Sequence, residues 1–81
     1  MHSDMSKNKI LIVDDEVMLT GLLSDHLQDN GYITYAANDA GEALRLLKNE
    51  PNLILLDINM PGIEVAKWFS VYPIYSWMSF V

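Results

Sequence analysis

The sequence predicts a small α/β domain with a parallel, doubly wound sheet, and three observations support this fold class. Three short apolar runs have the length of buried strands, and segments with a helical repeat of apolar residues separate them. This alternation is typical of right-handed crossovers and a parallel sheet. The first and third runs also end abruptly in carboxylates. Ligands bind such sheets at the carboxyl ends of the strands, so the acidic residues mark the candidate site.

The first strand is predicted at residues 9–13, which are almost continuously apolar and rich in β-branched side chains. The period then changes, and a helix is expected over residues 16–30. Asp14 or Asp15 is expected to cap this helix, and the following Asn-Gly pair to end it. The apolar residues expected on its inward face are Val17, Leu19, Leu22, Leu23 and Leu27.

A second short strand is predicted at residues 32–37, and a second helix from Asp39 to about Asn49. Asp39 and Glu42 have the spacing of a capping box, which marks the start of the helix. The proline after Glu50 ends the helix and favours an extended conformation at Glu50. The inward positions of this helix are expected to be Ala43, Leu44 and Leu47.

The third strand is predicted at residues 53–57, an apolar run that ends at Asp57. After a Pro-Gly break, residues 63–69 are expected to begin a third helix. In a doubly wound sheet whose strand order begins 2-1-3, the first and third strands are neighbours. Asp14, Asp15 and Asp57 should then meet at one edge of the sheet.

Three carboxylates that meet repel one another, so the arrangement calls for a cation. Oxygen ligands without sulfur or imidazole favour Mg²⁺ over zinc. Asp14 and Asp15 are the better pair to hold the metal, and the carbonyl of Asn59 could add an oxygen. Asp57, a single carboxylate after a buried strand, is the better nucleophile toward phosphorus. The alternative is that Asp14 and Asp15 only cap a helix and Asp57 only starts a turn.

Composition limits the expected partners. With 81 residues the chain forms one small domain, and its net charge of −6 argues against direct binding of nucleic acid by this segment. The absence of cysteine excludes disulfides and thiolate metal sites. The sequence shows neither a signal peptide nor an apolar stretch of the roughly 20 residues that span a bilayer. We therefore expect a cytoplasmic protein without a membrane partner.

Two motifs resemble the receiver domain of two-component response regulators. They are Lys-Ile-Leu-Ile-Val-Asp-Asp-Glu at residues 9–16 and Leu-Leu-Asp-Ile-Asn-Met-Pro-Gly at residues 55–62. The segments 30–32 and 36–44 between them resemble that family as well, so the similarity covers about residues 7–65. The resemblance implies a flavodoxin-like (CheY-like) parallel sheet.

The resemblance also implies a role for each acidic residue. Asp57 matches the phosphoacceptor, Asp14 and Asp15 match the acidic pair that holds Mg²⁺, and Asn59 matches the residue that lends a backbone carbonyl. The implied phosphoryl donor is a phosphohistidine on a sensor histidine kinase. Such a domain regulates an output and is not an enzyme, beyond its own phosphorylation and dephosphorylation.

The chain departs from the family pattern after Gly62. The loop that follows is shorter by on the order of three residues, about one helical turn. No lysine follows Lys67, so the family's lysine on strand five has no match. Ser76 and Ser79 are weak candidates for the family's hydroxyl residue on strand four.

We therefore expect a C-terminally truncated receiver in three parts. Residues 1–8 are a disordered N-terminus, residues 9–67 a partial receiver domain, and residues 68–81 an apolar, aromatic tail. Strands four and five are missing or replaced by this tail, which would leave strand three as an apolar edge. The tail could cover that edge as an improvised fourth strand, two copies could pair or exchange tails as a homodimer, or the chain could fold poorly alone.

Three functions follow from this reading. The first is a receiver module that takes a phosphoryl group onto Asp57 with Mg²⁺ and is impaired by truncation. The second is a non-signalling fragment that acts only by dimerisation or by titrating a partner. The third is a phosphatase that resembles the haloacid dehalogenases, which expect a second Asp two positions after the nucleophile. Because position 59 is Asn, the sequence gives this third reading little support.

Overall fold

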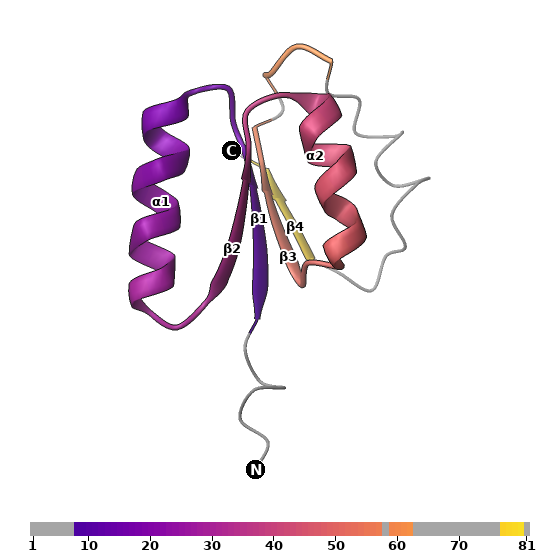
Figure 1. Cartoon of the computed structure of the whole chain (residues 1–81). Coiled ribbons are helices and arrows are strands. Elements are labelled where there is room, and N and C mark those ends of the chain that lie inside the picture. Colours follow the sequence, from indigo (N-terminus) through magenta and orange to yellow (C-terminus); the bar gives the residue numbers. More distant parts are fainter. Residues whose placement is uncertain (1–7, 58, 63–76, 81) are drawn as a thin grey trace.

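The computed structural model describes residues 8–57, 59–62 and 77–80. One sheet of parallel strands forms the centre, with a helix on each face (Figure 1). The strands are β1 (Lys9–Val13), β2 (Ile33–Ala37), β3 (Leu53–Leu56) and β4 (Trp77–Phe80). The helical elements are α1 (Val17–Asp29), α2 (Ala40–Leu46) and the 3₁₀ turn η2 (Leu47–Asn49).

The sheet has the order β2-β1-β3-β4, which confirms the predicted start 2-1-3. The register of β1 runs from Lys9 opposite Ile33 to Val13 opposite Ala37 on one side. On its other side, β1 pairs in parallel with β3 along nearly its whole length. The carboxyl ends of β1 and β3 therefore lie next to each other, as the acidic residues require.

The apolar tail supplies a fourth strand. Trp77 pairs with Leu53 and Phe80 with Leu56, in parallel, so β4 covers the edge of β3. This is the improvised fourth strand among the alternatives for the tail. The helix predicted at residues 63–69 lies outside the described residues, as does most of the N-terminal segment 1–8.

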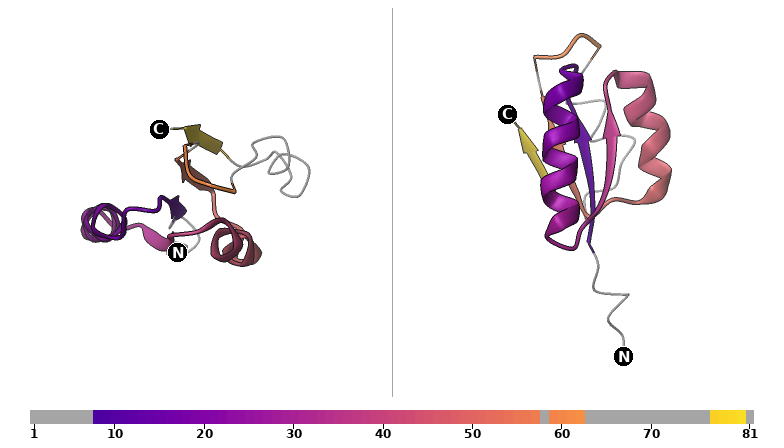
Figure 2. Two further views of the ribbon diagram at one scale, coloured as in Figure 1. Left: turned by 90° about the horizontal axis from the view of Figure 1, so that it is seen from above. Right: turned by 60° about the vertical axis from the view of Figure 1, so that its left-hand side comes forward.

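The main core lies between the sheet and α2, whereas α1 lies on the opposite face (Figures 1 and 2). Alternate residues of the central strands point to the α2 face, where Leu11, Ile54 and Leu56 are fully buried. The other buried members of this cluster are Val13, Ala37, Ala43, Leu47 and Met60. None of the helices in the described part of the chain is long and apolar enough to span a membrane.

The predicted inward face of α1 is wrong for three of its five residues. Val17 and Leu22 are 66% and 67% exposed, and Leu19 is exposed as well. Thr20 is buried instead, and Leu23 and Leu27 are half-buried. The helix is thus turned so that Thr20 and its neighbours, rather than the full row of leucines, face the sheet.

A polar network explains this rotation of α1. The hydroxyl groups of Ser24 and Thr34 share a hydrogen bond of 2.6 Å, which joins α1 to β2. The Gln28 side chain donates to both hydroxyls, at 2.9 Å and 2.8 Å. These hydrogen bonds turn the side of α1 that carries Ser24 and Gln28 toward β2, where Ser24 is half-buried and Gln28 stays exposed.

The capping box of the second helix is confirmed at its start. Asp39 is the N-cap of α2, and its Oδ1 accepts a hydrogen bond of 2.7 Å from the backbone N–H of Glu42. The Glu42 carboxylate accepts in return from the backbone N–H of Asn38, one residue before the cap. The buried face of α2 differs from the prediction at one residue. Leu44 was expected to point inward but is 46% exposed, whereas Leu46 packs against the core.

The expected extended conformation of Glu50 is also wrong. Glu50 has φ 55° and ψ 59°, which is left-handed. Its backbone N–H donates to the carbonyl of Leu47 at 2.9 Å, so it closes the last helical turn as a C-cap. The closing turn outweighs the preference for extended backbone before proline.

Candidate functional site

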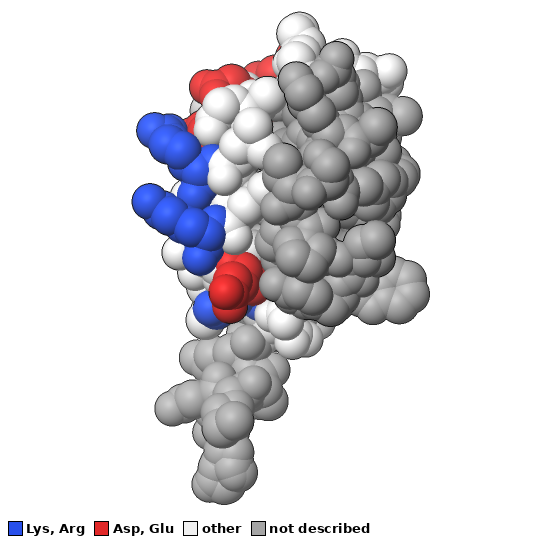
Figure 3. All heavy atoms as spheres, turned by 90° about the vertical axis from the view of Figure 1, so that its right-hand side faces the viewer, with Lys and Arg blue, Asp and Glu red and all other residues white. Residues whose placement is uncertain are grey.

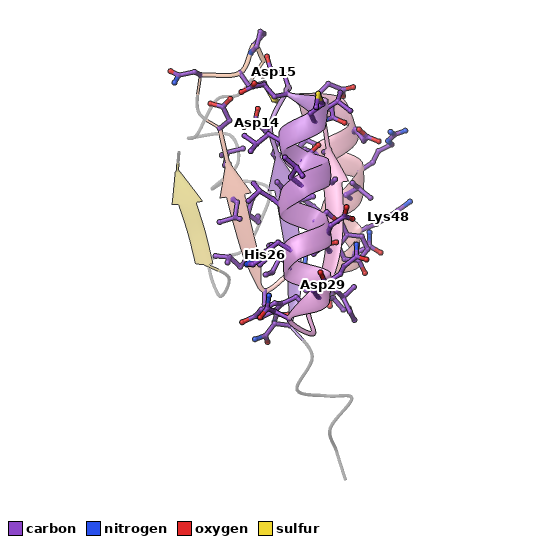
Figure 4. All side chains as sticks on the ribbon, turned by 90° about the vertical axis from the view of Figure 1, so that its left-hand side faces the viewer. Asp14, Asp15, His26, Asp29 and Lys48 are labelled. Carbon is purple, nitrogen blue, oxygen red and sulfur yellow. The ribbon has the colours of Figure 1, made fainter. Side chains whose placement is uncertain are left out.

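The structure brings Asp14, Asp15 and Asp57 together at the carboxyl end of the sheet. Backbone hydrogen bonds between the strands continue one residue past the ends of β1 and β3. The N–H of Asp14 donates to the carbonyl of Ala37 at 3.1 Å, and the N–H of Asp57 donates to the carbonyl of Val13 at 3.0 Å. One carboxylate oxygen from each acid lies within 4.8 Å of the others. Figure 4 shows Asp14 and Asp15 at this end of the sheet, away from His26 and Asp29 on α1.

The three carboxylates differ in exposure and in their hydrogen bonds. Asp14 is buried, Asp57 is half-buried and Asp15 is exposed, so one side of the cluster is open to solvent. Asp14 Oδ1 accepts from the backbone N–H of Glu16 at 3.0 Å, and Asp57 Oδ1 accepts from that of Asn59 at 2.9 Å. Among the described residues, Oδ2 of Asp14 and Asp57 and both oxygens of Asp15 accept no hydrogen bond.

The prediction that Asp14 or Asp15 caps α1 is wrong. The N-cap of α1 is Glu16, whose own side chain makes no capping hydrogen bond. Asp14 binds the backbone N–H of Glu16 from two residues earlier, and the Asp15 side chain caps nothing in the described residues. This hydrogen bond is an Asx-turn that precedes the helix, and it uses one oxygen of Asp14.

The donor set fits a small, hard cation. The cluster offers oxygen atoms from three carboxylates, which suit Mg²⁺ better than a soft metal. Its open side leaves room for the water ligands that Mg²⁺ keeps. The basic residues in the described part of the chain lie elsewhere. Lys9 Nζ donates to the carbonyl of Asn49, and Arg45 in α2 and Lys48 in η2 are exposed. Figure 3 shows basic side chains gathered along one edge of the face that it presents.

A tight turn follows Asp57 and keeps Asn59 beside it. The backbone N–H of Asn59 binds the Asp57 side chain, and that of Met60 donates to the Asp57 carbonyl at 3.3 Å. Met60 is 4% exposed and anchors this turn in the core. Asn59 itself is exposed. That its carbonyl serves as a metal ligand stays a prediction.

Two residues beside the cluster were not identified from the sequence. The Asn38 side chain, from the loop after β2, donates to the carbonyl of Asp14 at 2.8 Å and to Thr20 Oγ1 at 3.1 Å. Thr20 is 2% exposed and donates to the carbonyl of Val17 at 2.9 Å. The only sequence signal for either residue is a polar side chain at the end of a strand or on an inward helical position.

A pocket of about 480 Å³ lies at the other end of the strands. Ile10 and Leu53, which form the first pair between β1 and β3, lie in its wall. The remaining lining residues are Asn8, Leu27, Tyr32 and Asn52. Its described lining residues include no carboxylate, and none of them belongs to the acidic cluster.

Comparison with known proteins identifies the family. The profile of the response regulator receiver domain matches residues 10–69, which is more than half of the chain. The chain belongs to this family. Its relatives include the transcriptional regulatory protein CpxR of Escherichia coli (strain K12), 44% identical over 63 residues. The alkaline phosphatase synthesis transcriptional regulatory protein PhoP of Bacillus subtilis (strain 168) is 46% identical over 63 residues.

The receiver chain is much shorter than these relatives. The match to CpxR covers 74% of this chain and 27% of the relative, and the match to PhoP covers 73% and 26%. The chain therefore spans about a quarter of the length of the curated relatives it matches.

Solved receivers share the fold. The chemotaxis response regulator CheY4 of Vibrio cholerae superposes with a TM-score of 0.71 at 26% identity, over 93% of this chain and 68% of the other. The response regulator protein TrrA, solved in complex with the histidine kinase ThkA, gives 0.76 at 31% identity, over 90% and 66%. These similarities confirm the flavodoxin-like (CheY-like) fold class.

Proposed function

We propose that this receiver domain accepts a phosphoryl group on Asp57 from the phosphohistidine of a sensor histidine kinase in the cytoplasm. Asp14, Asp15 and Asp57, with the carbonyl of Asn59, would hold Mg²⁺ beside the acceptor. One observation carries this proposal. Carboxylate oxygens of the three acids lie within 4.8 Å of one another at the strand ends of a receiver fold.

The reaction is a transfer between two side chains. A carboxylate oxygen of Asp57 forms a bond to phosphorus while the phosphorus–nitrogen bond of the phosphohistidine breaks. The electron pair of that bond stays on the imidazole, which takes a proton from solvent. Bound Mg²⁺ supplies positive charge that offsets the negative charge of the phosphoryl oxygens. The backbone N–H of Asn59 holds Asp57 Oδ1, which orients the carboxylate and leaves Oδ2 for the attack.

A kinase partner is supported by two observations. The neighbour TrrA was solved in complex with a histidine kinase. In this chain, α1 begins directly after the acidic loop and exposes apolar side chains at its start. Val17 and Met18 are 66% and 82% exposed, and Leu22 follows one turn later at 67%. A partner that reaches Asp57 from the α1 side would cover these residues.

The phosphoacceptor role has a direct test. We expect a small phosphodonor and Mg²⁺ to increase the mass of the protein by one phosphoryl group, and Asp57→Asn to abolish the increase. The reaction should be much slower in a chelator than with Mg²⁺, because the ion offsets the negative charge of the phosphoryl oxygens. Mass spectrometry of the intact protein over a time course measures the rate.

A matched control is Asp25→Asn, which removes an exposed carboxylate from the middle of α1. This variant should react like the wild-type protein. A mass increase that persists in Asp57→Asn would place the phosphoryl group elsewhere and contradict the proposal. If the wild-type protein gains no mass after long incubation, the alternative of a non-signalling fragment is favoured.

We also propose that the chain is dimeric, or aggregates, at micromolar concentration. The sheet of the described residues has β2 at one edge, where Ile33 is 38% exposed, and the tail strand β4 at the other. Unpaired strand edges and exposed apolar residues on α1 favour association between copies. Sedimentation velocity over a concentration series measures the oligomeric state. A compact monomer that unfolds cooperatively would count against association.

A further inference from the structure

The loop that carries the acidic pair is held from the side by one residue of another loop. Asn38 follows β2, and its side-chain amide donates to the carbonyl of Asp14 at 2.8 Å and to Thr20 Oγ1 at 3.1 Å. Its own backbone N–H donates to the Glu42 carboxylate at 3.1 Å. Asn38 thus joins the loop after β1, the first turn of α1 and the start of α2.

The contact with Asp14 bears on Asp15 through the peptide bond. The carbonyl of Asp14 and the N–H of Asp15 belong to one planar unit, so fixing the carbonyl fixes the direction in which the chain enters Asp15. The same residue is held on its other side, because the Asp14 N–H donates to the Ala37 carbonyl at 3.1 Å. Asp15 is exposed, and its side chain accepts no hydrogen bond among the described residues. Its placement beside Asp57 therefore depends on its backbone.

Thr20 provides the second acceptor for the Asn38 side chain. It is 2% exposed, and its hydroxyl donates to the Val17 carbonyl at 2.9 Å while accepting from Asn38. The backbone N–H of Thr20 also donates to the Glu16 carbonyl at 3.1 Å, which joins the first turn of α1 to the acidic loop. A buried threonine in this position gives the Asn38 amide a fixed acceptor.

We propose that Asn38 is a positioning residue that orients the acidic pair and makes the site selective for Mg²⁺ over Ca²⁺. The inference rests on the proposed function, because it assumes that these carboxylates hold a divalent cation. Mg²⁺ demands a nearly ideal octahedral arrangement of ligands, whereas Ca²⁺ accepts flexible, irregular ones. A loop that is free to shift therefore weakens Mg²⁺ binding more than Ca²⁺ binding.

The variant Asn38→Ala tests this inference. It removes both side-chain hydrogen bonds and leaves the three carboxylates in place. We expect its affinity for Mg²⁺ to fall about tenfold, the lower end of the effect of residues that support metal ligands. Its affinity for Ca²⁺ should fall much less, so the ratio of the two affinities drops. Isothermal titration calorimetry with each chloride salt measures both, and a general loss of structure would not change their ratio.

Two further variants separate positioning from stability. Thr20→Val removes the second acceptor of Asn38 and should lower the affinity ratio in the same direction, by a smaller factor. Thr34→Val breaks the polar network between α1 and β2, which includes neither Asp14 nor Asn38. It should lower the melting temperature and leave the ratio unchanged. If Asn38→Ala does not fold, the inference is tested by Thr20→Val and Thr34→Val alone. It holds if the affinity ratio falls in Thr20→Val but not in Thr34→Val.

The possible outcomes separate the inference from the proposed function. Equal affinity ratios in the wild-type protein, Asn38→Ala and Thr20→Val would overturn the inference and leave the phosphoacceptor proposal intact. A wild-type protein that binds Mg²⁺ with the expected selectivity but never becomes phosphorylated would contradict the proposed function alone. No Mg²⁺ binding by the wild-type protein would overturn both.

Discussion

Replacing Leu11 by alanine is expected to remove most of the free energy of unfolding of this protein. Leu11 is fully buried in the centre of β1 and belongs to the core cluster under α2. Truncating a buried leucine costs about 3–4 kcal/mol, from lost apolar contact and the cavity left behind. A domain of this size has about 5 kcal/mol of stability in total. Urea unfolding followed by far-ultraviolet circular dichroism measures the loss.

The matched control is Leu22→Ala, the same chemical change at a residue that is 67% exposed. It should change the free energy of unfolding by about 0.5 kcal/mol or less, as exposed substitutions do. The comparison also tests the observed rotation of α1, since the sequence placed Leu22 on the inward face. If Leu22→Ala destabilises as strongly as Leu11→Ala, then Leu22 is buried in solution, and the observed orientation of α1 is wrong.

The strands were the most predictable part of the fold. Residues 9–13 were assigned correctly because a strand buried on both faces needs a continuous apolar run, and the carboxylates after it mark its end. The third strand was one residue too long, since β3 ends at Leu56 and Asp57 only continues the pairing through its backbone N–H. Alternation of strands and helices then indicated a parallel sheet, and the order 2-1-3 followed from assuming the doubly wound flavodoxin type.

The orientation of the helices could not be predicted in the same way. The leucines of α1 cover a broad arc of the helix, so periodicity alone does not say which part of that arc meets the sheet. The choice is made by contacts with β2, where Thr34 provides a hydrogen-bonding partner for Ser24 and Gln28. The partner belongs to a different element, and no local pattern records it.

The candidate site was also predictable only in part. Asp14, Asp15 and Asp57 could be placed together from the strand order, because parallel neighbours end at the same edge of a sheet. The roles of Asn38 and Thr20 could not, since their contact joins residues 18 positions apart through side-chain atoms. Topology brings the acids to one edge, and only the packed structure shows which residues hold them in place.

Replacing Asp15 by asparagine is expected to stabilise the protein in the absence of Mg²⁺ and to reduce the stability that added Mg²⁺ provides. Without Mg²⁺, the variant should be more stable by about 1 kcal/mol, the repulsion of two charges at the spacing of this cluster in water. With millimolar Mg²⁺, the wild-type protein should gain stability as the folded state binds the ion, and the variant should gain much less. Thermal unfolding in a chelator and at increasing Mg²⁺ concentrations measures both effects.

Asp15 is the most informative of the three acids to neutralise. Its side chain accepts no hydrogen bond among the described residues, so the change to asparagine removes charge without weakening a backbone hydrogen bond, whereas Asp14 and Asp57 each accept one. Asp25→Asn removes an equal charge from an exposed position on α1 and should respond to Mg²⁺ like the wild-type protein. If Asp15→Asn and Asp25→Asn respond alike, the acids do not act together on a cation. Their proximity would then reflect only the caps and turns that end two neighbouring strands.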